Sequence, residues 1–209
     1  MYLDVFDRNP YGTNCWLVGA ESSDEAVVVD PGFEPAAVRA LLEAAGRSPV
    51  AVVLTHAHLD HAGTAGAFAG DDVPVFCHPA DALAFTDPAA WRRDDFPNPL
   101  ADAKDLRTFE DGDVLRFAGV SLKVWHTPGH TPGHCVFPAA DEAAVFSGDL
   151  VFAGTVGRSD FANSDPEAMQ ASLRRFLTLP DGLVVLPGHG PRTDVATERA
   201  ANPHLRGLG

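Results

Sequence analysis

Short apolar runs, rich in Val, Leu and Phe, alternate with polar, glycine-rich or proline-rich segments along almost the whole chain. Apolar runs of this length between turn residues are typical of strands buried in a sheet. We therefore predict strands at residues 2–6, 14–18, 26–29, 50–54, 73–77, 114–117, 120–125, 135–137, 143–146 and 183–186.

Helical patterns separate these groups of strands, at residues 35–45, 64–68, 80–85, 166–177 and 195–200. Pro35 and Pro166 suit the first turn of a helix, and Asp165 is placed to cap the helix that follows it. The residues alone predict an α/β protein with several short strands. A length of 209 residues fits a single domain over residues 1–209.

The run at residues 50–54 is followed at once by four metal-binding side chains, His56, His58, Asp60 and His61. We expect them in the loop beyond the strand, where the His-x-His pair shares one side and Asp60 and His61 turn toward a second point. Imidazole and carboxylate donors suit zinc, iron or manganese, whereas structural zinc sites more often use thiolates. The cluster predicts metal-dependent chemistry.

Three later apolar runs also end in Gly or Pro and then present one donor each, namely His130, Asp149 and His189. Loops at the edge of a rigid sheet are a usual place for such ligands. His126 and His134 flank His130, and we expect them to be satisfied or exposed histidines rather than ligands.

The formal net charge of −14 argues against a nucleic-acid-binding surface, which needs clustered Lys and Arg. Cys15, Cys77 and Cys135 are odd in number and widely spaced, so we expect buried thiols and a reducing, cytoplasmic location. The chain shows neither a secretory leader nor a membrane-spanning stretch, and we expect no membrane partner. The oligomeric state is left open.

The ordered motifs resemble the metallo-β-lactamase-fold hydrolases, and within them the short, single-domain, glyoxalase II-like (hydroxyacylglutathione hydrolase-like) branch. The resemblance rests on residues 56–61, on Thr-Pro-Gly-His-Thr at 127–131, Ser-Gly-Asp at 147–149, Gly-Arg-Ser-Asp-Phe at 157–161 and Pro-Gly-His-Gly-Pro at 187–191. It implies an αββα sandwich, with two mixed sheets between helical layers. It also implies one metal on His56, His58 and His130, a second on Asp60, His61 and His189, and Asp149 bridging them.

The resemblance implies hydrolysis of a small-molecule acyl thioester, such as an S-acyl-glutathione, by a hydroxide that bridges two divalent ions. Two-metal hydrolytic sites hold their ions roughly 3.5–4 Å apart. We expect zinc, with iron or manganese as alternatives. Asp60 is the predicted catalytic residue, because it is placed to steer the hydroxide or to pass its proton to the leaving group.

Four further features are candidates for the substrate side of the site. By the resemblance, Asp30 supports a metal-binding histidine, with turn capping as the alternative that we favour less. The loop that carries Tyr11 resembles one that overhangs the site, so Tyr11 either contacts substrate or packs in a turn. Arg158 either attracts a substrate carboxylate or braces Asp160. Residues 85–104, rich in Pro and Asp, form either a lid or a packed surface excursion.

Two other activities stay open. A persulfide dioxygenase-like oxidoreductase would use a single iron on His56, His130 and Asp149. A lactonase or β-lactamase-like hydrolase would use the same ligands as the thioesterase, because the ligand set does not separate these bonds. The chain also ends about twenty residues after His189, without the helical extension with which full-length glyoxalase II holds glutathione, so the thiol carrier is open.

Overall fold

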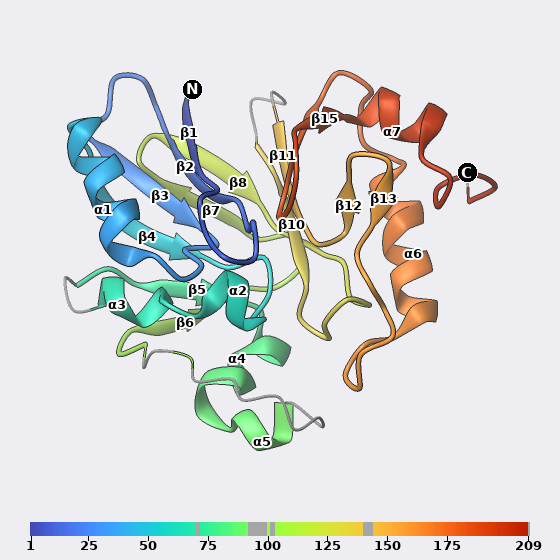
Figure 1. Cartoon of the computed structure of the whole chain (residues 1–209), viewed down its shortest axis with the longest axis horizontal. Coiled ribbons are helices and arrows are strands. Elements are labelled where there is room, and N and C mark those ends of the chain that lie inside the picture. Colours follow the sequence, from blue (N-terminus) through green and yellow to red (C-terminus); the bar gives the residue numbers. More distant parts are fainter. Residues whose placement is uncertain (70–71, 92–99, 101–102, 140–143, 209) are drawn as a thin grey trace.

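Two mixed β-sheets stack face to face between outer helices in the computed structural model (Figure 1). The model describes residues 1–69, 72–91, 100, 103–139 and 144–208. The αββα sandwich expected from the resemblance is confirmed by this arrangement. Among the described residues, no helix is long and apolar enough to cross a bilayer.

Within the described residues, the first sheet has six strands in the order β1-β2-β3-β4-β5-β6. The first three pair antiparallel, and β3 to β6 run parallel. Their bounds are Tyr2–Phe6 (β1), Cys15–Gly19 (β2), Glu25–Val29 (β3), Ser48–Val53 (β4), Val75–Cys77 (β5) and Leu106–Thr108 (β6).

The second sheet has the order β15-β14-β11-β10-β9 in the part of the chain that is described. Its strands are Trp125–His126 (β9), Cys135–Pro138 (β10), Ala144–Gly148 (β11), Val184–Pro187 (β14) and Thr193–Asp194 (β15). Two hairpins accompany the sheets, β7 (Val114–Phe117) with β8 (Val120–Lys123) and β12 (Val151–Phe152) with β13 (Thr155–Val156).

Helices cover the outer faces of both sheets (Figure 1). They are α1 (Pro35–Ala44), α2 (Leu59–Ala62), α3 (Ala65–Ala69), α4 (Pro79–Thr86), α5 (Pro88–Trp91), α6 (Pro166–Phe176) and α7 (Val195–Ala201). As predicted, Asp165 caps α6, because its side chain accepts hydrogen bonds from the backbone N–H groups of Glu167 and Ala168.

Three apolar clusters hold the layers together. The central one lies between the sheets and includes Trp16, Phe137 and Phe146. The second packs α1, α3 and α4 on the first sheet, and the third packs α6 on the second. Phe137 is fully buried, and truncating such a side chain to Ala costs about 3–5 kcal/mol. The two central layers therefore form a rigid frame for the loops at their edges.

The predicted strands all appear among the described residues with small shifts of their ends, except that residues 120–125 divide into β8 and β9. The elements β6, β12, β13, β15, α2 and α5 are short, and the apolar pattern of the sequence did not predict them. In β6, Arg107 and Thr108 are exposed, so this edge strand has no apolar run to reveal it.

Candidate metal centre

The predicted donors meet because their strands end at neighbouring places in the two sheets. The His-x-His segment follows β4, Asp149 follows β11, and His189 follows β14. Strands β11 and β14 are parallel neighbours, so their carboxyl ends deliver Asp149 and His189 side by side. His130 comes from the loop between β9 and β10.

The expectation that residues 56–61 form only a loop is wrong for the second half of the motif. Asp60 and His61 lie in the short helix α2, which begins directly after His58. His58 keeps an extended backbone (φ −65°, ψ 149°) at the helix start. The chain turns at this point, so one short segment supplies donors in two directions.

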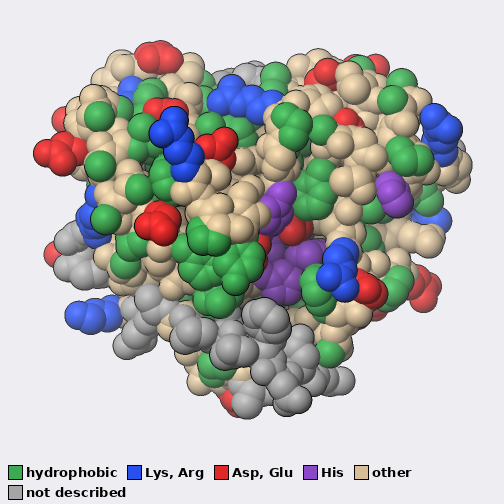
Figure 2. Space-filling view, in the orientation of Figure 1, with side chains coloured by type: hydrophobic (Ala, Val, Ile, Leu, Met, Phe, Trp, Pro, Cys, Tyr) green, Lys and Arg blue, Asp and Glu red, His purple; other side chains and the backbone are tan. Residues whose placement is uncertain are grey.

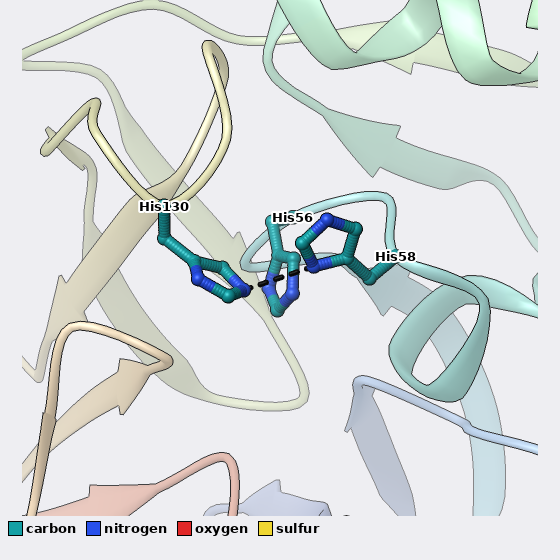
Figure 3. A group of neighbouring side chains, drawn as sticks. All are labelled: His56, His58 and His130. Atoms are coloured by element: carbon teal, nitrogen blue, oxygen red, sulfur yellow. Dashed lines mark hydrogen bonds between the residues drawn. The ribbon is translucent and has the colours of Figure 1, made fainter. Parts of the chain in front are cut away.

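The first group of donors consists of His56, His58 and His130, whose ligand atoms all lie within 4.8 Å of one another. Figure 3 shows the three rings converging from two separate loops. Nδ1 of His58 lies 2.9 Å from Nε2 of His130. The site therefore brings together nitrogen atoms from residues 72 positions apart in sequence.

A chain of hydrogen bonds sets the proton position on His56. The hydroxyl of Thr55 donates to Oδ2 of Asp30 at 2.6 Å, so its oxygen accepts from Nδ1 of His56 at 3.0 Å. Nε2 of His56 is then an unprotonated lone pair. It is buried and has no hydrogen-bond partner among the described residues. Burial, and then the neighbouring His61 and His130, hold the pKa of His56 well below its usual value, so the ring stays neutral.

His130 is oriented in the same way. Its Nδ1 lies 2.7 Å from the backbone oxygen of Arg158, and a carbonyl can only accept, so Nδ1 carries the proton. Nε2 of His130 therefore presents a lone pair toward His58. A partner that fixes one ring nitrogen and leaves the other as a free base is usual for metal-binding histidines.

The second group consists of Asp60, His61 and His189. Nε2 of His61 lies 3.2 Å from Nε2 of His189, and Oδ2 of Asp60 lies 3.2 Å from Nε2 of His189 and 3.5 Å from Nε2 of His61. Burial lowers the pKa of His61, but the carboxylates of Asp60, Asp149 and Asp30 outweigh it and raise the pKa to about 10. Without a metal, the buried imidazole of His61 is therefore protonated and carries a positive charge among these carboxylates.

Asp30 orients His61, a member of this second group, through a hydrogen bond. Its Oδ2 accepts from Nδ1 of His61 at 3.0 Å, and its Oδ1 accepts from the backbone N–H of Thr55 at 2.8 Å. Asp30 has φ of 53°, in the left-handed region where Asp is tolerated better than most residues. The ligand atoms of Asp30, His56 and His61 also lie within 4.8 Å of one another. Because both oxygens of Asp30 already accept hydrogen bonds, it is better placed to orient histidines than to bind metal.

Asp149 lies between the two groups. Its Oδ1 is 3.3 Å from Nε2 of His61, and its Oδ2 is 3.4 Å from Nε2 of His130 and 3.7 Å from Nε2 of His189. Oδ1 is buried and has no hydrogen-bond partner within the described chain. A Cβ on Gly188 would lie 2.3 Å from this oxygen, so glycine is required for β14 to end so close to Asp149.

These observations fit two divalent ions. The donors are imidazoles and carboxylates, Nε2 of His56 and Oδ1 of Asp149 are buried without a hydrogen-bond partner among the described residues, and Asp149 reaches both groups. Buried polar atoms normally have hydrogen-bond partners, so two buried acceptors that have none, one in the first group and one beside the second, are suited to contact a cation. The donor set suits zinc and equally accepts iron or manganese.

A cavity of about 500 Å³ opens over these donors, and Asp60, His130, Asp149 and His189 line its floor. Figure 2 shows histidine side chains at the surface of this face, with hydrophobic side chains beside them. The walls are largely apolar and include Phe33, Phe152, Val156 and Phe161. The site is therefore accessible from solvent and shaped for a small molecule.

Tyr11 and Arg158, the two predicted substrate contacts, both line this cavity. Tyr11 is 54% exposed, and its ring stacks on Phe33 with a centroid distance of 4.9 Å. Arg158 forms a two-point ion pair with Asp160 at 2.9 and 3.0 Å and lies over the ring of Phe161. The brace predicted for Arg158 is thus present, within reach of the cavity. Half of the segment 85–104, namely residues 92–99 and 101–102, lies outside the described residues, so the choice between a lid and a surface excursion stays open.

The flanking histidines are satisfied by protein groups. Nε2 of His134 accepts from the backbone N–H of Asp149 at 3.1 Å, and its Nδ1 lies 2.9 Å from the hydroxyl of Thr127. Nε2 of His126 donates to the backbone oxygen of Pro132 at 2.9 Å. His134 thus anchors the backbone of Asp149, a role that its sequence position did not indicate.

An N-terminal segment that the sequence pattern does not mark as functional holds the His189 loop. Asn14 donates from its backbone N–H to Gly188 and from Nδ2 to Pro187 and Gly190, and Trp16 donates from Nε1 to Pro187. The hydroxyl of Thr13 donates to Oδ2 of Asp60 at 3.3 Å. No local sequence pattern predicts these contacts, because they join residues more than 45 positions apart in sequence.

Proteins similar to this chain carry several different activities in their names. It is 34% identical to a probable metallo-hydrolase, YqgX, of Bacillus subtilis, over 90% of both chains. It is 31% identical to the hydroxyacylglutathione hydrolase GloC of Haemophilus influenzae, over 98% of both chains.

Solved structures show the same variety. The B3 metallo-beta-lactamase BLEG-1 has 33% identity and a TM-score of 0.87, covering 99% of this chain and 100% of its own. TTHA1623 in a di-iron-bound form has 39% identity and a TM-score of 0.81, over 97% and 99%. ETHE1 from Myxococcus xanthus has 26% identity and a TM-score of 0.81, over 99% and 85%.

The family model of the metallo-beta-lactamase superfamily matches residues 8–189, which include every proposed metal ligand from His56 to His189. The fold and the family match therefore agree, and this chain belongs to the metallo-beta-lactamase superfamily.

Proposed function

We propose that this chain is a dinuclear metal hydrolase that cleaves a small acyl thioester, either an S-acyl-glutathione or a similar thiol ester. The observation that carries the proposal is the position of Asp149, whose two oxygens adjoin both donor groups. The similarity to the hydroxyacylglutathione hydrolase GloC over nearly the full length supports a thioester as the substrate class. The acidic chain, with net charge −14, suits a small molecule better than nucleic acid.

His56, His58 and His130 would hold one ion, Asp60, His61 and His189 the other, and Asp149 both. When bound, the two ions supply a Lewis acid for the thioester carbonyl and an activated water. Asp60 is the proposed proton carrier. The hydroxyl of Thr13 donates to its Oδ2, and His61 and His189 outweigh the effect of burial and hold the pKa of Asp60 well below its usual value. Asp60 thus stays ionised as an acceptor beside the reacting centre.

The cavity walls define how the substrate would lie. Phe152, Phe161 and the stacked Tyr11–Phe33 pair offer apolar surface to the acyl chain or to the thiol carrier. These side chains also displace water from the carbonyl, which strengthens the electrostatic interactions there. Three buried free thiols, at Cys15, Cys77 and Cys135, support our expectation of a cytoplasmic enzyme.

Two alternatives have support of their own. The similarity to ETHE1 favours a mononuclear iron oxygenase on His56, His130 and Asp149, and the similarity to BLEG-1 favours lactam hydrolysis. The second donor group weighs against a single iron, because its ligand atoms also lie within 4.8 Å of one another. We expect two ions and hence hydrolysis.

The test is an activity panel on protein of known metal content. Metal analysis after purification without added metal should give two ions per chain. The panel compares S-D-lactoylglutathione and acetyl-thiol esters, a lactone, a β-lactam and glutathione persulfide, the last with an oxygen electrode. Thioester cleavage should exceed the other reactions in kcat/KM. A single iron per chain together with oxygen uptake on persulfide would overturn the proposal.

A further inference from the structure

Asp81 is a fully buried carboxylate on α4, away from the proposed metal ligands along the chain and outside the cavity lining. It accepts four hydrogen bonds. Oδ2 accepts from the backbone N–H of Ala57 at 2.9 Å and the hydroxyl of Thr131 at 2.7 Å. Oδ1 accepts from the backbone N–H of Gly133 at 2.7 Å and Nε1 of Trp91 at 3.2 Å.

These partners belong to the two loops that build the first donor group. Ala57 is the residue between His56 and His58, while Thr131 and Gly133 lie one and three positions after His130. The two loops are otherwise far apart in sequence, and one carboxylate fastens both backbones. A Cβ on Gly133 would lie 2.7 Å from the Asp81 carboxylate, so glycine is needed for this approach.

Trp91 adds a contact with a ligand itself. Its ring packs edge-on against His58, with centroids 5.8 Å apart, while its Nε1 donates to Asp81. Asp81 thereby restrains the backbone around His58 through Ala57 and the packing of its ring through Trp91.

We propose that Asp81 is a positioning residue that sets the separation of the His56–His58 loop from the His130 loop, and with it the affinity of the first metal site. The proposal rests on the two-metal centre proposed above. Asp81 would serve the first donor group as Asp30 serves the second. Asp30 binds an imidazole directly, whereas Asp81 binds the loop backbones and Trp91.

Only a carboxylate satisfies all four donors. Three of them are N–H groups, which cannot accept, and the fourth is a hydroxyl. Burial raises the pKa of the Asp81 carboxyl, and the hydrogen bonds from Thr131, Ala57, Trp91 and Gly133 oppose that rise. In Asp81→Asn the amide NH₂ faces at least one N–H in either orientation, so Ala57 or Gly133 must shift.

Glu198 provides a matched control. It is also a buried carboxylate, 2% exposed, and accepts from the backbone N–H of Gly154, the hydroxyl of Thr193 and Nδ2 of Asn202. These contacts lie around α7 and touch none of the proposed ligands. Glu198→Gln therefore reproduces the cost of a neutralised buried carboxylate without moving a ligand loop.

The experiment measures metal affinity rather than turnover. Metal-free wild type, Asp81→Asn and Glu198→Gln are titrated with Co²⁺, followed by its visible absorption, and their thermal midpoints are recorded. Both variants should lose thermal stability. Only Asp81→Asn should bind one of the two Co²⁺ ions more weakly, by about 10–100-fold, as for residues that orient ligands.

Two backgrounds identify the affected site. The His189→Ala variant keeps the first site, and adding Asp81→Asn to it should lower the Co²⁺ affinity. The His130→Ala variant keeps the second site, and adding Asp81→Asn to it should leave the Co²⁺ affinity unchanged. Should Asp81→Asn fail to fold, Thr131→Val removes one of the four hydrogen bonds and should weaken the same site less. Equal Co²⁺ affinity in Asp81→Asn and Glu198→Gln would overturn the proposal, whereas a wild type that binds fewer than two ions would overturn the two-metal centre itself.

Discussion

Oδ1 of Asp149 lies 3.3 Å from Nε2 of His61, yet it accepts no hydrogen bond from any described group. A buried anionic oxygen without a hydrogen bond is costly, and a bound cation beside it would offset that cost. Asp149→Asn should lower the metal content below two ions per chain and turnover by at least about 10²-fold, comparable to the loss of an oxyanion contact. Metal analysis and thioester kinetics check this, and two tightly bound ions in the variant would contradict the bridging role.

Asp60→Asn tests the proton carrier. The amide cannot accept a proton, so kcat should fall by about 10²–10⁴-fold, the usual contribution of a general base. Thr13→Val, which removes only the hydrogen bond to Asp60, should have a smaller effect. Asp105→Asn is the control, since Asp105, whose side chain is 40% exposed, pairs with Arg107 away from the cavity. An Asp60→Asn enzyme with near wild-type kcat would remove Asp60 from the mechanism.

Asp30→Asn tests support of the second donor group. Asn tolerates the left-handed backbone of residue 30, so the fold should persist. The amide carries no charge and accepts through a single oxygen, so it cannot accept from the backbone N–H of Thr55 and from Nδ1 of His61 at the same time. We expect affinity for one ion to fall by about 10–100-fold. Isothermal titration with Zn²⁺ measures this, and unchanged affinity would show that Asp30 only caps the turn.

Tyr11→Ala tests the apolar wall of the cavity. Losing the ring removes its stack on Phe33, and the KM for thioesters with long acyl chains should rise by about fivefold, or about 1 kcal/mol of binding. The kcat and the metal content should stay unchanged, because Tyr11 contributes no metal ligand. Tyr11→Phe keeps the ring and serves as control. A fall in kcat without a rise in KM would place Tyr11 in the chemistry instead.

His78 predicts a pH dependence of stability away from the metal centre. Burial of His78 lowers its pKa most, and His126, whose ring stacks on it with centroids 3.9 Å apart, lowers it further. Together they outweigh the opposite effect of Asp111 and bring the pKa of His78 to about 4. An unfolded histidine has a pKa near about 6.5. Between these two pKa values the unfolded chain binds more protons at His78 than the folded chain does. The contribution of His78 to the free energy of unfolding is therefore complete above about pH 6.5 and is lost as the pH falls toward about 4.

His78→Asn isolates the effect, because Asn retains a side chain able to cap α4. With metal-free protein, denaturant unfolding at pH 7 and pH 4.5 should show a larger loss of unfolding free energy in wild type than in the variant. Equal losses would mean that His78 titrates alike in the folded and unfolded chains.

The apolar runs and the donor motifs are local features, and they predicted much of the molecule. A buried strand such as β4 needs consecutive apolar side chains, and the His-x-His-x-Asp-His cluster follows it within a few positions. The α/β class that these runs predict is confirmed, and so is the αββα sandwich that the resemblance implied. The short helix α2 and the exposed edge strand β6 carry no such run, and both were missed.

The tertiary structure alone decided how the site is held. The proton on His56 is set by Thr55 and Asp30, and the two ligand loops are fastened by Asp81, which looks in sequence like an ordinary acid in a helix. Such roles arise from contacts between residues distant in sequence, which the periodicity of a chain does not record. The sequence by itself therefore determined which atoms are available as donors, and folding determined which lone pairs are free, buried and directed at a common point.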